Sequence, residues 1–131
     1  MVNHMSRKYG LSETEYELMD FFWNAEEKRS FKQLLEYFND QKEKNWKKQT
    51  LSSFLKILQD KELIGTDANG KKYLYYALHT REQHIHQWVR GLVRSSFDNS
   101  MKQFLTAFSG GERLSEQDVQ DLKDCLKKYE K

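Results

Sequence analysis

The stretch between Trp46 and Leu58 constrains the fold of this chain more than any other. Apolar residues recur there at i, i+3, i+4 and i+7, the spacing of one helix face, and they are Leu51, Phe54, Leu55 and Leu58. The opposite face is short, polar and cationic, without an acidic residue, and is formed by Gln49, Ser52, Ser53 and Lys56. A face that serves only solubility usually mixes charges of both signs, as the rest of this chain does. The stretch therefore predicts a helix with one buried face and one face suited to a polar or anionic partner.

A β-hairpin is predicted directly after this helix. A short apolar strand is followed by the Asn69-Gly70 pair, which suits the left-handed backbone angles of a tight hairpin turn. Residues 71–78 then alternate between two faces, as a half-buried strand does. Lys71 and Lys72 stand at the tip of the hairpin, where a phosphate could be reached.

Two more helices precede these elements. Ser12 and Glu15 form a capping box, which predicts a helix start near Glu13. Ser30 is a second predicted N-cap, and the apolar residues within 31–38 again have helical spacing. The order helix, helix, helix, hairpin is that of a winged helix-turn-helix, in which the third helix enters the major groove of DNA and the hairpin flanks it. The predicted fold class is therefore mainly α with a small β-hairpin wing.

A helical module is predicted after the wing. The expected organisation is a flexible N-terminal tail at 1–10, a winged-helix DNA-binding domain at 11–79 and a helical dimerisation domain at 80–131. Helices of this length cannot bury their apolar stripes within one small chain, and pairing adds a second DNA half-site. The alternative is that these helices fold back onto the winged domain. The residues expected at the dimer interface are Ile85, Trp88, Leu92, Met101, Phe104, Leu105, Phe108, Val119, Leu122 and Leu126.

Composition excludes several classes of protein. The net charge is only +2, so the positive charge that matters is local, within residues 42–48. A single cysteine excludes an internal disulfide and, with neither a signal peptide nor an apolar run of membrane length, predicts a cytoplasmic protein. His84 and His86 point to different faces of a helix, which argues against a metal site. Because the sequence has no catalytic array and no phosphate-binding glycine loop, neither an enzyme nor a cofactor is predicted.

The polar face of the third helix is the predicted DNA-reading surface. Gln, Ser and Thr side chains can reach base edges, whereas lysines hold phosphates. The expected base contacts are Gln49, Thr50, Ser52 and Ser53. The expected phosphate contacts are Lys44, Lys47, Lys48 and Lys56, with Lys71 and Lys72 on the flank. These contacts predict steric repression by a homodimer that places two helices in successive major grooves of an inverted-repeat operator.

Two other functions fit the same pattern. Winged helices also serve as protein-interaction modules without sequence-specific DNA binding, and the near-neutral net charge permits that role. The second is a dimer whose DNA affinity is set by a small molecule, with Trp88, Phe97 and Phe104 as the candidate lining. The acid-free face of the third helix favours DNA as the partner.

The chain resembles the penicillinase repressor family, the group that includes BlaI, MecI and CopY, from Leu11 to Lys128. Four segments carry the resemblance: the opening helix at 11–19 with Trp23 after it, the third helix at 46–58, the closing strand of the wing at 75–78, and residues 104–118 of the last two helices. The resemblance implies a homodimeric winged-helix repressor of inverted-repeat operators, often with TACA and TGTA half-sites. For some members it also implies a receptor-protease that cleaves within the dimerisation helices, and for others a cysteine-rich tail that senses copper.

The chain departs from the family pattern in the third helix. Thr50 matches the family, whereas Ser52 and Ile57 stand where the family has arginines. Because arginine is the usual reader of guanine, the operator is expected to differ from the common one.

Two departures concern the signal that relieves repression. The cleavage site of the β-lactamase repressors is an Asn-Phe pair, and the aligned pair here is Ala107-Phe108. Cys125 stands alone, without the cysteine pairs of a copper-sensing tail. Copper sensing is therefore not expected, and the sensor upstream of this chain is left open.

Overall fold

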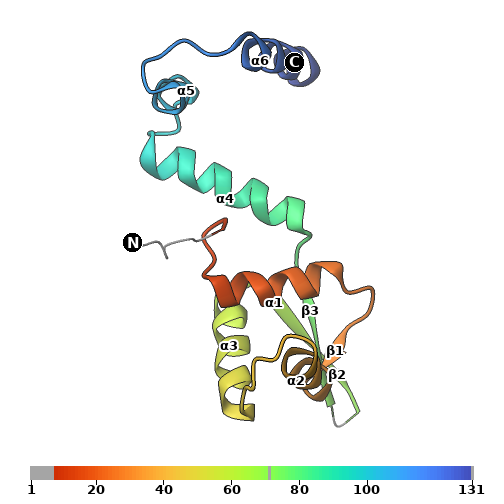
Figure 1. Cartoon of the computed structure of the whole chain (residues 1–131). Helices are drawn as coiled ribbons and strands as arrows, with labels where there is room; N and C mark the ends of the chain where they lie inside the picture. The colour runs from red at the N-terminus through yellow and green to blue at the C-terminus, as the bar shows by residue number, and fades with distance from the viewer. Residues whose placement is uncertain (1–7, 71, 131) are drawn as a thin grey trace. The chain divides into compact units, whose positions relative to one another are not determined.

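The computed structural model describes residues 8–70 and 72–130, and it divides the chain into two compact units, of which the second begins at Arg90. The elements are drawn in Figure 1. They are α1 (Glu13–Asn24), β1 (Arg29–Ser30), α2 (Phe31–Asp40), α3 (Lys48–Asp60), β2 (Ile64–Asn69), β3 (Lys72–Ala77), α4 (Arg81–Ser96), α5 (Met101–Ser109) and α6 (Glu116–Tyr129). The described residues thus form a mainly helical chain with a small antiparallel sheet, and the predicted winged-helix fold class is confirmed.

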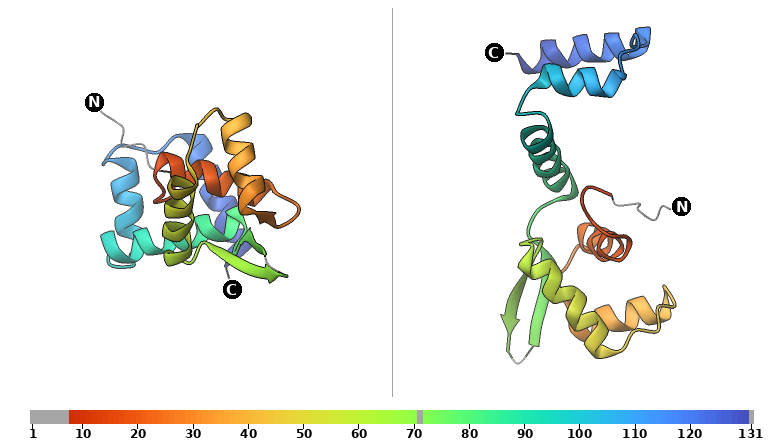
Figure 2. Two further views of the ribbon diagram at one scale, coloured as in Figure 1. Left: turned by 90° about the horizontal axis from the view of Figure 1, so that it is seen from below. Right: turned by 90° about the vertical axis from the view of Figure 1, so that its left-hand side faces the viewer.

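The first unit is built around one hydrophobic core to which all three of its leading helices contribute. Leu18 of α1, Leu34 and Phe38 of α2, and Leu51 and Leu58 of α3 are fully buried in it. The apolar face predicted for the third helix is therefore the face that packs inward. Because α3 is held along its whole length by this core, its opposite face is fixed in place as an outward surface (Figure 2).

The starts of α1 and α2 follow from local side-chain chemistry. The Ser12 hydroxyl accepts a hydrogen bond from the Glu15 backbone N–H at 3.2 Å, and the Glu15 carboxylate accepts one from the Ser12 N–H at 2.8 Å. Ser30 and Gln33 form the same reciprocal pair at the start of α2. Both predicted N-caps are confirmed, because each box satisfies backbone donors that the helix itself leaves without partners.

The sheet contains one strand that the sequence did not predict. Its order is β1-β3-β2, with β3 antiparallel to both neighbours. Strand β1 is only two residues long and lies between α1 and α2, where Arg29 pairs with Tyr75 and Ser30 with Leu74. Two residues are too short for an alternating pattern, so only the tertiary structure reveals this strand.

The hairpin turn is displaced by one residue from the predicted Asn-Gly pair. Asn69 is still paired, opposite Lys72, so the turn begins after Asn69. Gly70 has a φ of 68°, in the left-handed region that a residue without a Cβ adopts readily. Lys71 of the predicted wing tip lies outside the described residues.

The predicted flexible tail does not extend to residue 10. Lys8 and Leu11 form a backbone bridge, and the Tyr9 ring packs edge-on against Trp88 with centroids 5.9 Å apart. His84 Nε2 lies 3.0 Å from the Tyr9 carbonyl oxygen, to which it donates. These contacts join the start of the chain to α4, a long-range arrangement that local sequence patterns do not signal.

The boundary between the two units also differs from the predicted one at residue 79. The first unit continues to Val89, because the first part of α4 packs on the winged helix. His84 is buried there and its ring lies 5.6 Å from that of Trp23. Thr80 caps the start of α4, with its hydroxyl accepting from the Gln83 N–H at 3.1 Å.

The second unit holds the rest of α4 with α5 and α6. Gly110 ends α5 in a left-handed conformation, and Ser115 caps α6 by accepting from the Asp118 N–H at 3.0 Å. Neither α5 nor α6 contains a buried residue. Within the described ranges, no helix combines the length and the apolar character needed to cross a membrane.

Candidate nucleic-acid interface

The outer face of α3 is accessible along the whole helix. Gln49, Ser52 and Ser53 are exposed, as is Lys48, and Thr50 is half-buried. The Ser53 hydroxyl donates to the Gln49 carbonyl at 3.0 Å, while the other polar tips of this face have no hydrogen bond within the described structure. The residues predicted to meet base edges therefore lie together on one face of one helix.

The approach to α3 is fixed by one asparagine at the end of α2. Asn39 Oδ1 accepts from the Trp46 backbone N–H at 2.6 Å, and Asn39 Nδ2 donates to the Trp46 carbonyl at 2.9 Å. The Trp46 ring also stacks on Phe38, with centroids 5.1 Å apart. This two-point bond sets the position at which the chain enters α3.

The first turn of α3 is electropositive. Its N-cap is Lys47, whose side chain makes no capping bond, and the turn holds no acidic residue. The N-terminus of a helix carries a partial positive charge from its aligned peptide dipoles. Lys47 and Lys48, both exposed, add two formal charges at the same end.

Two predicted phosphate contacts are already engaged within the chain. Lys44 Nζ lies 2.7 Å from Glu17 Oε1, and both side chains are partly buried. Lys56 Nζ lies 3.7 Å from Asp60 Oδ2, one helical turn away, where both groups are exposed. Lys44 therefore differs from the exposed lysines, because it is partly buried and its charge is already paired. The Lys56 side chain stays accessible, because its ion pair with Asp60 is longer and exposed.

A groove with a basic rim opens between α2, the start of α3 and the wing. Its volume is about 550 Å³. Lysines from three separate elements line it: Lys32 from α2, Lys48 from α3 and Lys72 from β3. The remaining lining residues are Ser30, Phe31, Leu35, Tyr73 and Tyr75, so the groove has an aromatic and aliphatic floor and no acidic residue.

Lys32 and Tyr73 are site residues that sequence reasoning missed. Lys32 follows the N-cap of α2 in the sequence and is exposed, so only the fold shows that it faces the same groove as Lys48. Tyr73 lies within the alternating strand pattern, and its side chain is 62% exposed. Burial raises the pKa of the nearby Tyr75 hydroxyl, with Tyr73 adding to the shift.

The residues predicted at the dimer interface fall into both units. Ile85 and Trp88 belong to the first unit, where Trp88 contacts Tyr9 and stays 38% exposed. All the others belong to the second unit and are exposed or half-buried there; they are Leu92, Met101, Phe104, Leu105, Phe108, Val119, Leu122 and Leu126. Phe97, Phe104 and Phe108 form a ring contact series, with centroids 5.6 Å and 6.5 Å apart.

The residues compared with the family's cleavage and metal sites are placed as follows. Ala107 and Phe108 are exposed within α5, in regular helix. His84 is engaged with the Tyr9 carbonyl, whereas His86 is exposed. Cys125 is exposed on α6.

Three core-forming helices, of which the third begins with a basic first turn that holds no acidic residue, and a hairpin wing define the class of this protein as a winged-helix DNA-binding regulator. Comparison with known proteins supports the same class. A family model described as penicillinase repressor matches residues 11–128. The methicillin resistance regulatory protein MecI of Staphylococcus epidermidis is 21% identical over 123 residues, which cover 94% of this chain and 98% of that protein.

A solved structure is also similar, that of Bacillus subtilis PadR in complex with operator DNA. It has 22% sequence identity and a TM-score of 0.43, and the match covers 88% of this chain and 69% of that one.

The chain belongs to the penicillinase repressor family, because the family match spans nearly all of it. The resemblance found in the sequence is thereby confirmed. The family and the fold are those of winged-helix transcriptional repressors that bind DNA.

Proposed function

We propose that this chain is a homodimeric repressor that binds an inverted-repeat operator through α3 of each protomer. The exposed polar face of α3, which holds no acidic residue between Lys48 and Gln59, carries this proposal. Gln49, Thr50, Ser52 and Ser53 would face the base edges of the major groove. Because operator DNA is the ligand, the proposed site of action is the cytoplasm.

The basic groove beside α3 supports a defined path for the DNA backbone. Lys32, Lys48 and Lys72 approach it from three elements, and a phosphate chain is the ligand that such a rim suits. The positive end of the α3 dipole lies at Lys48, which adds to the attraction. The exposed Tyr73 ring would lie against the sugars next to those phosphates. Lys44, held by Glu17, is left out of the proposed contact set.

The second unit supports dimer formation. Its exposed large apolar side chains include Met101, Phe108, Leu126 and Tyr129, which are costly to leave in water. A second copy of the chain would cover them with an equivalent surface, as in most soluble oligomers. Two linked reading helices gain affinity because the second contact forms within the complex already made by the first.

The proposed function can be tested by fluorescence anisotropy at two salt concentrations. Three duplexes are compared: an inverted TACA/TGTA repeat, a single half-site, and a scrambled sequence. A dimeric operator-binding protein should prefer the repeat to the half-site, and the half-site to the scrambled duplex. If none of the three is preferred, a repeat selected from random sequence replaces the first, since Ser52 stands where the family has Arg. Equal binding to the scrambled duplex and to the best selected one would contradict sequence-specific repression.

Two alanine variants separate the roles within the interface. Lys48→Ala should weaken binding to every duplex alike and reduce the salt slope by about one unit. Gln49→Ala should instead change which sequence is preferred, by about 1–3 kcal/mol for a good base contact. Lys102→Ala, an exposed lysine on α5, is the matched control and should leave both properties unchanged. If Lys48→Ala and Gln49→Ala both bind DNA as the parent protein does, α3 is not the reading helix.

A further inference from the structure

One large apolar side chain lies on the polar outer side of α3. Ile57 is 41% exposed, whereas every other large apolar residue of α1, α2 and α3, helices that the structure describes in full, is buried or half-buried. Ile57 follows Ser53 by one helical turn, and Ser53 follows Gln49 by one turn, so the three side chains form a row along the helix surface. Ile57 therefore continues the row of expected base contacts toward the end of α3.

The position of Ile57 is fixed before any partner binds. A β-branched side chain has one strongly preferred rotamer in a helix. The helix itself is held by Leu51, Leu55 and Leu58, which are buried in the core. Because so little freedom remains to be lost, a contact at Ile57 has a small entropic cost.

The distance between Ile57 and Gln49 allows them to contact different base pairs. An α-helix rises about 1.5 Å per residue, so the two residues are about 12 Å apart along the axis of α3. The major groove accommodates a helix, and successive turns of that helix meet successive base pairs. Ile57 would therefore read a position in the half-site that Gln49 does not reach.

The groups around Ile57 are poorly suited to guanine. The Ser53 hydroxyl donates to the Gln49 carbonyl at 3.0 Å, so the Ser53 oxygen is left as an acceptor. Lys56, which precedes Ile57, has its ammonium group 3.7 Å from Asp60 Oδ2. Guanine displays two acceptors in the major groove and is read by donors, whereas thymine displays an apolar C5-methyl group there. An exposed isoleucine matches the thymine methyl.

We propose that Ile57 determines part of the operator sequence by contacting the C5-methyl group of a thymine in each half-site. This inference rests on the proposed function, since it requires α3 to lie in the major groove. The family has an arginine where this chain has Ile57, and arginine is the usual reader of guanine. The exchange replaces a cationic contact by an apolar one, and so favours a different base.

The contact can be tested at the level of one methyl group. Deoxyuridine pairs as thymidine does and lacks only the C5-methyl group. The inverted repeat that the full-length protein prefers, either the TACA/TGTA repeat or one selected from random sequence, is prepared with each thymine of one half-site replaced in turn. Fluorescence anisotropy then gives the ratio of Kd values for the uracil and thymine duplexes, for the parent protein and for Ile57→Ala.

Uracil at one position should weaken binding of the parent protein by about three- to fivefold, the effect expected when one methyl group loses its apolar contact. Ile57→Ala should bind the thymine and uracil duplexes equally at that position. Ile57→Arg should also lose the uracil penalty, because a guanidinium group replaces the apolar contact. This second variant keeps the test valid if Ile57→Ala fails to fold.

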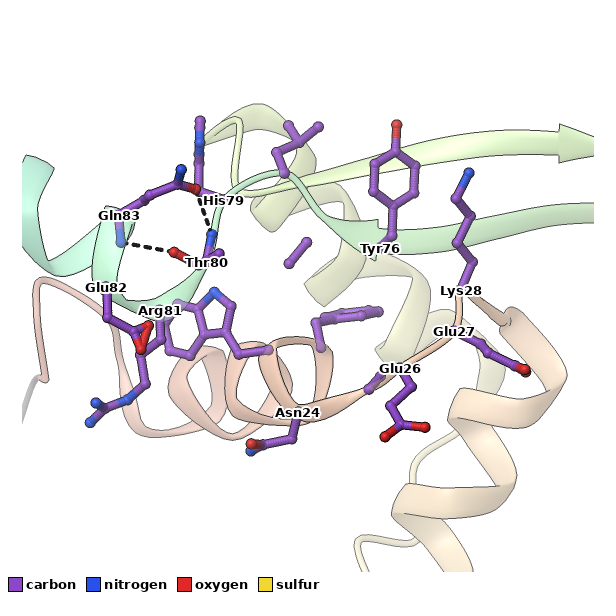
Figure 3. A pocket seen from close by; sticks show the side chains of 15 residues that line it. Asn24, Glu26, Glu27, Lys28, Tyr76, His79, Thr80, Arg81, Glu82 and Gln83 are labelled. Carbon is purple, nitrogen blue, oxygen red and sulfur yellow. Dashed lines mark hydrogen bonds between the residues drawn. The ribbon is translucent and has the colours of Figure 1, made fainter.

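Leu78→Ala is the matched control, because Leu78 is an aliphatic residue of nearly the same exposure, 43%. It follows β3 and lines the cavity at Trp23, which lies between the end of α1 and the start of α4 (Figure 3). It belongs neither to α3 nor to the basic groove beside that helix. This variant should keep the full uracil penalty.

Two outcomes would overturn the contact and leave the proposed function intact. One is a preferred repeat without a uracil penalty at any thymine, and the other is a set of penalties that all persist in Ile57→Ala. If no repeat is preferred to the scrambled duplex, the proposed function and the contact at Ile57 are overturned together.

Discussion

The two units of this chain differ in how their apolar residues are used. In the first unit, Leu34 and Phe38 are 0% exposed and belong to a closed core shared by three helices and the sheet. In the second, Phe108 and Leu126 are each 65% exposed, and α5 and α6 contain no buried residue. Both units have amphipathic helices with regular caps, so secondary structure does not separate them. This difference shows that an apolar stripe indicates which face of a helix packs against a neighbouring surface, but not whether that surface belongs to the same chain.

The largest expected effect comes from placing a charge on the uncovered face of the second unit. Phe108→Asp should abolish dimer formation, because a carboxylate would be desolvated at the proposed interface. Affinity for the full inverted repeat should fall by about 10²- to 10⁴-fold, the range gained by linking two binding sites. Affinity for a single half-site should change little. Sedimentation equilibrium and anisotropy measure the two effects on the same samples.

Gln103→Asp is the control for this variant, since Gln103 is exposed on the same helix and the change in charge is the same. It should remain dimeric. A monomeric parent protein at micromolar concentration would contradict the proposed difference between the units.

The next largest effect is expected in the closed core. Phe38→Ala removes a fully buried ring that stacks on Trp46 and lies 5.7 Å from Phe21. The free energy of unfolding should fall by about 3–5 kcal/mol, as for other buried aromatic residues replaced by alanine. Urea denaturation followed by Trp fluorescence measures this loss. A loss below about 1 kcal/mol would show that the core of the first unit is looser than its packing indicates.

An intermediate effect is expected at the entry to α3. Asn39→Ala removes both hydrogen bonds to the Trp46 backbone and leaves a partly buried N–H and carbonyl without partners. Stability should fall by about 1–3 kcal/mol. DNA affinity should fall even at temperatures where the variant is fully folded, because the start of α3 is no longer fixed. Asn24→Ala, which breaks local bonds at the end of α1, is the comparison and should leave DNA affinity unchanged.

The smallest predicted effect concerns acid stability of the first unit. Burial alone would raise the pKa of Glu15, but hydrogen bonds from Lys61 at 2.8 Å and from Ser12 outweigh it, and the folded pKa lies below its ordinary value. The stability contributed by Glu15 is therefore fully present above pH of about 4.3 and is lost as the pH falls through the lower folded value.

Glu15→Gln should accordingly flatten the acid limb of a plot of melting temperature against pH. The effect at neutral pH should be about 0.2–1 kcal/mol, because Lys61 is partly exposed. Glu13→Gln, an exposed acid in the same turn, should keep the parent slope. An unchanged acid limb in Glu15→Gln would show that Glu15 does not couple folding to pH.

The helices of this protein could be predicted from the sequence because their signals are local. Four helices begin at a capping side chain, in segments where the spacing of polar and apolar residues indicates a helix. The capping residues are Ser12, Ser30, Thr80 and Ser115. The outer face of α3 could likewise be assigned, since a helix with one apolar stripe must turn the other side outward.

The features that could not be predicted depend on contacts between distant segments. Strand β1 pairs with β3, and Tyr9 contacts His84 and Trp88 of α4. The groove at Lys32 and the cavity at Trp23 each join several elements that are far apart in the chain. A sequence pattern names the residues on one element, but it does not show which elements meet.

The pairing of β1 with β3 has a consequence for the speed of folding. The helices start at their own capping residues and can form early, whereas Ser30 and Leu74 must meet across most of the first unit. The chain contains no proline, so prolyl isomerisation adds no slow phase to refolding. We expect closure of this short strand to be the slow intramolecular event, so a stopped-flow refolding trace should slow when Leu74, the partner of Ser30, is replaced by glycine, but not when Gln103 is replaced by Asp.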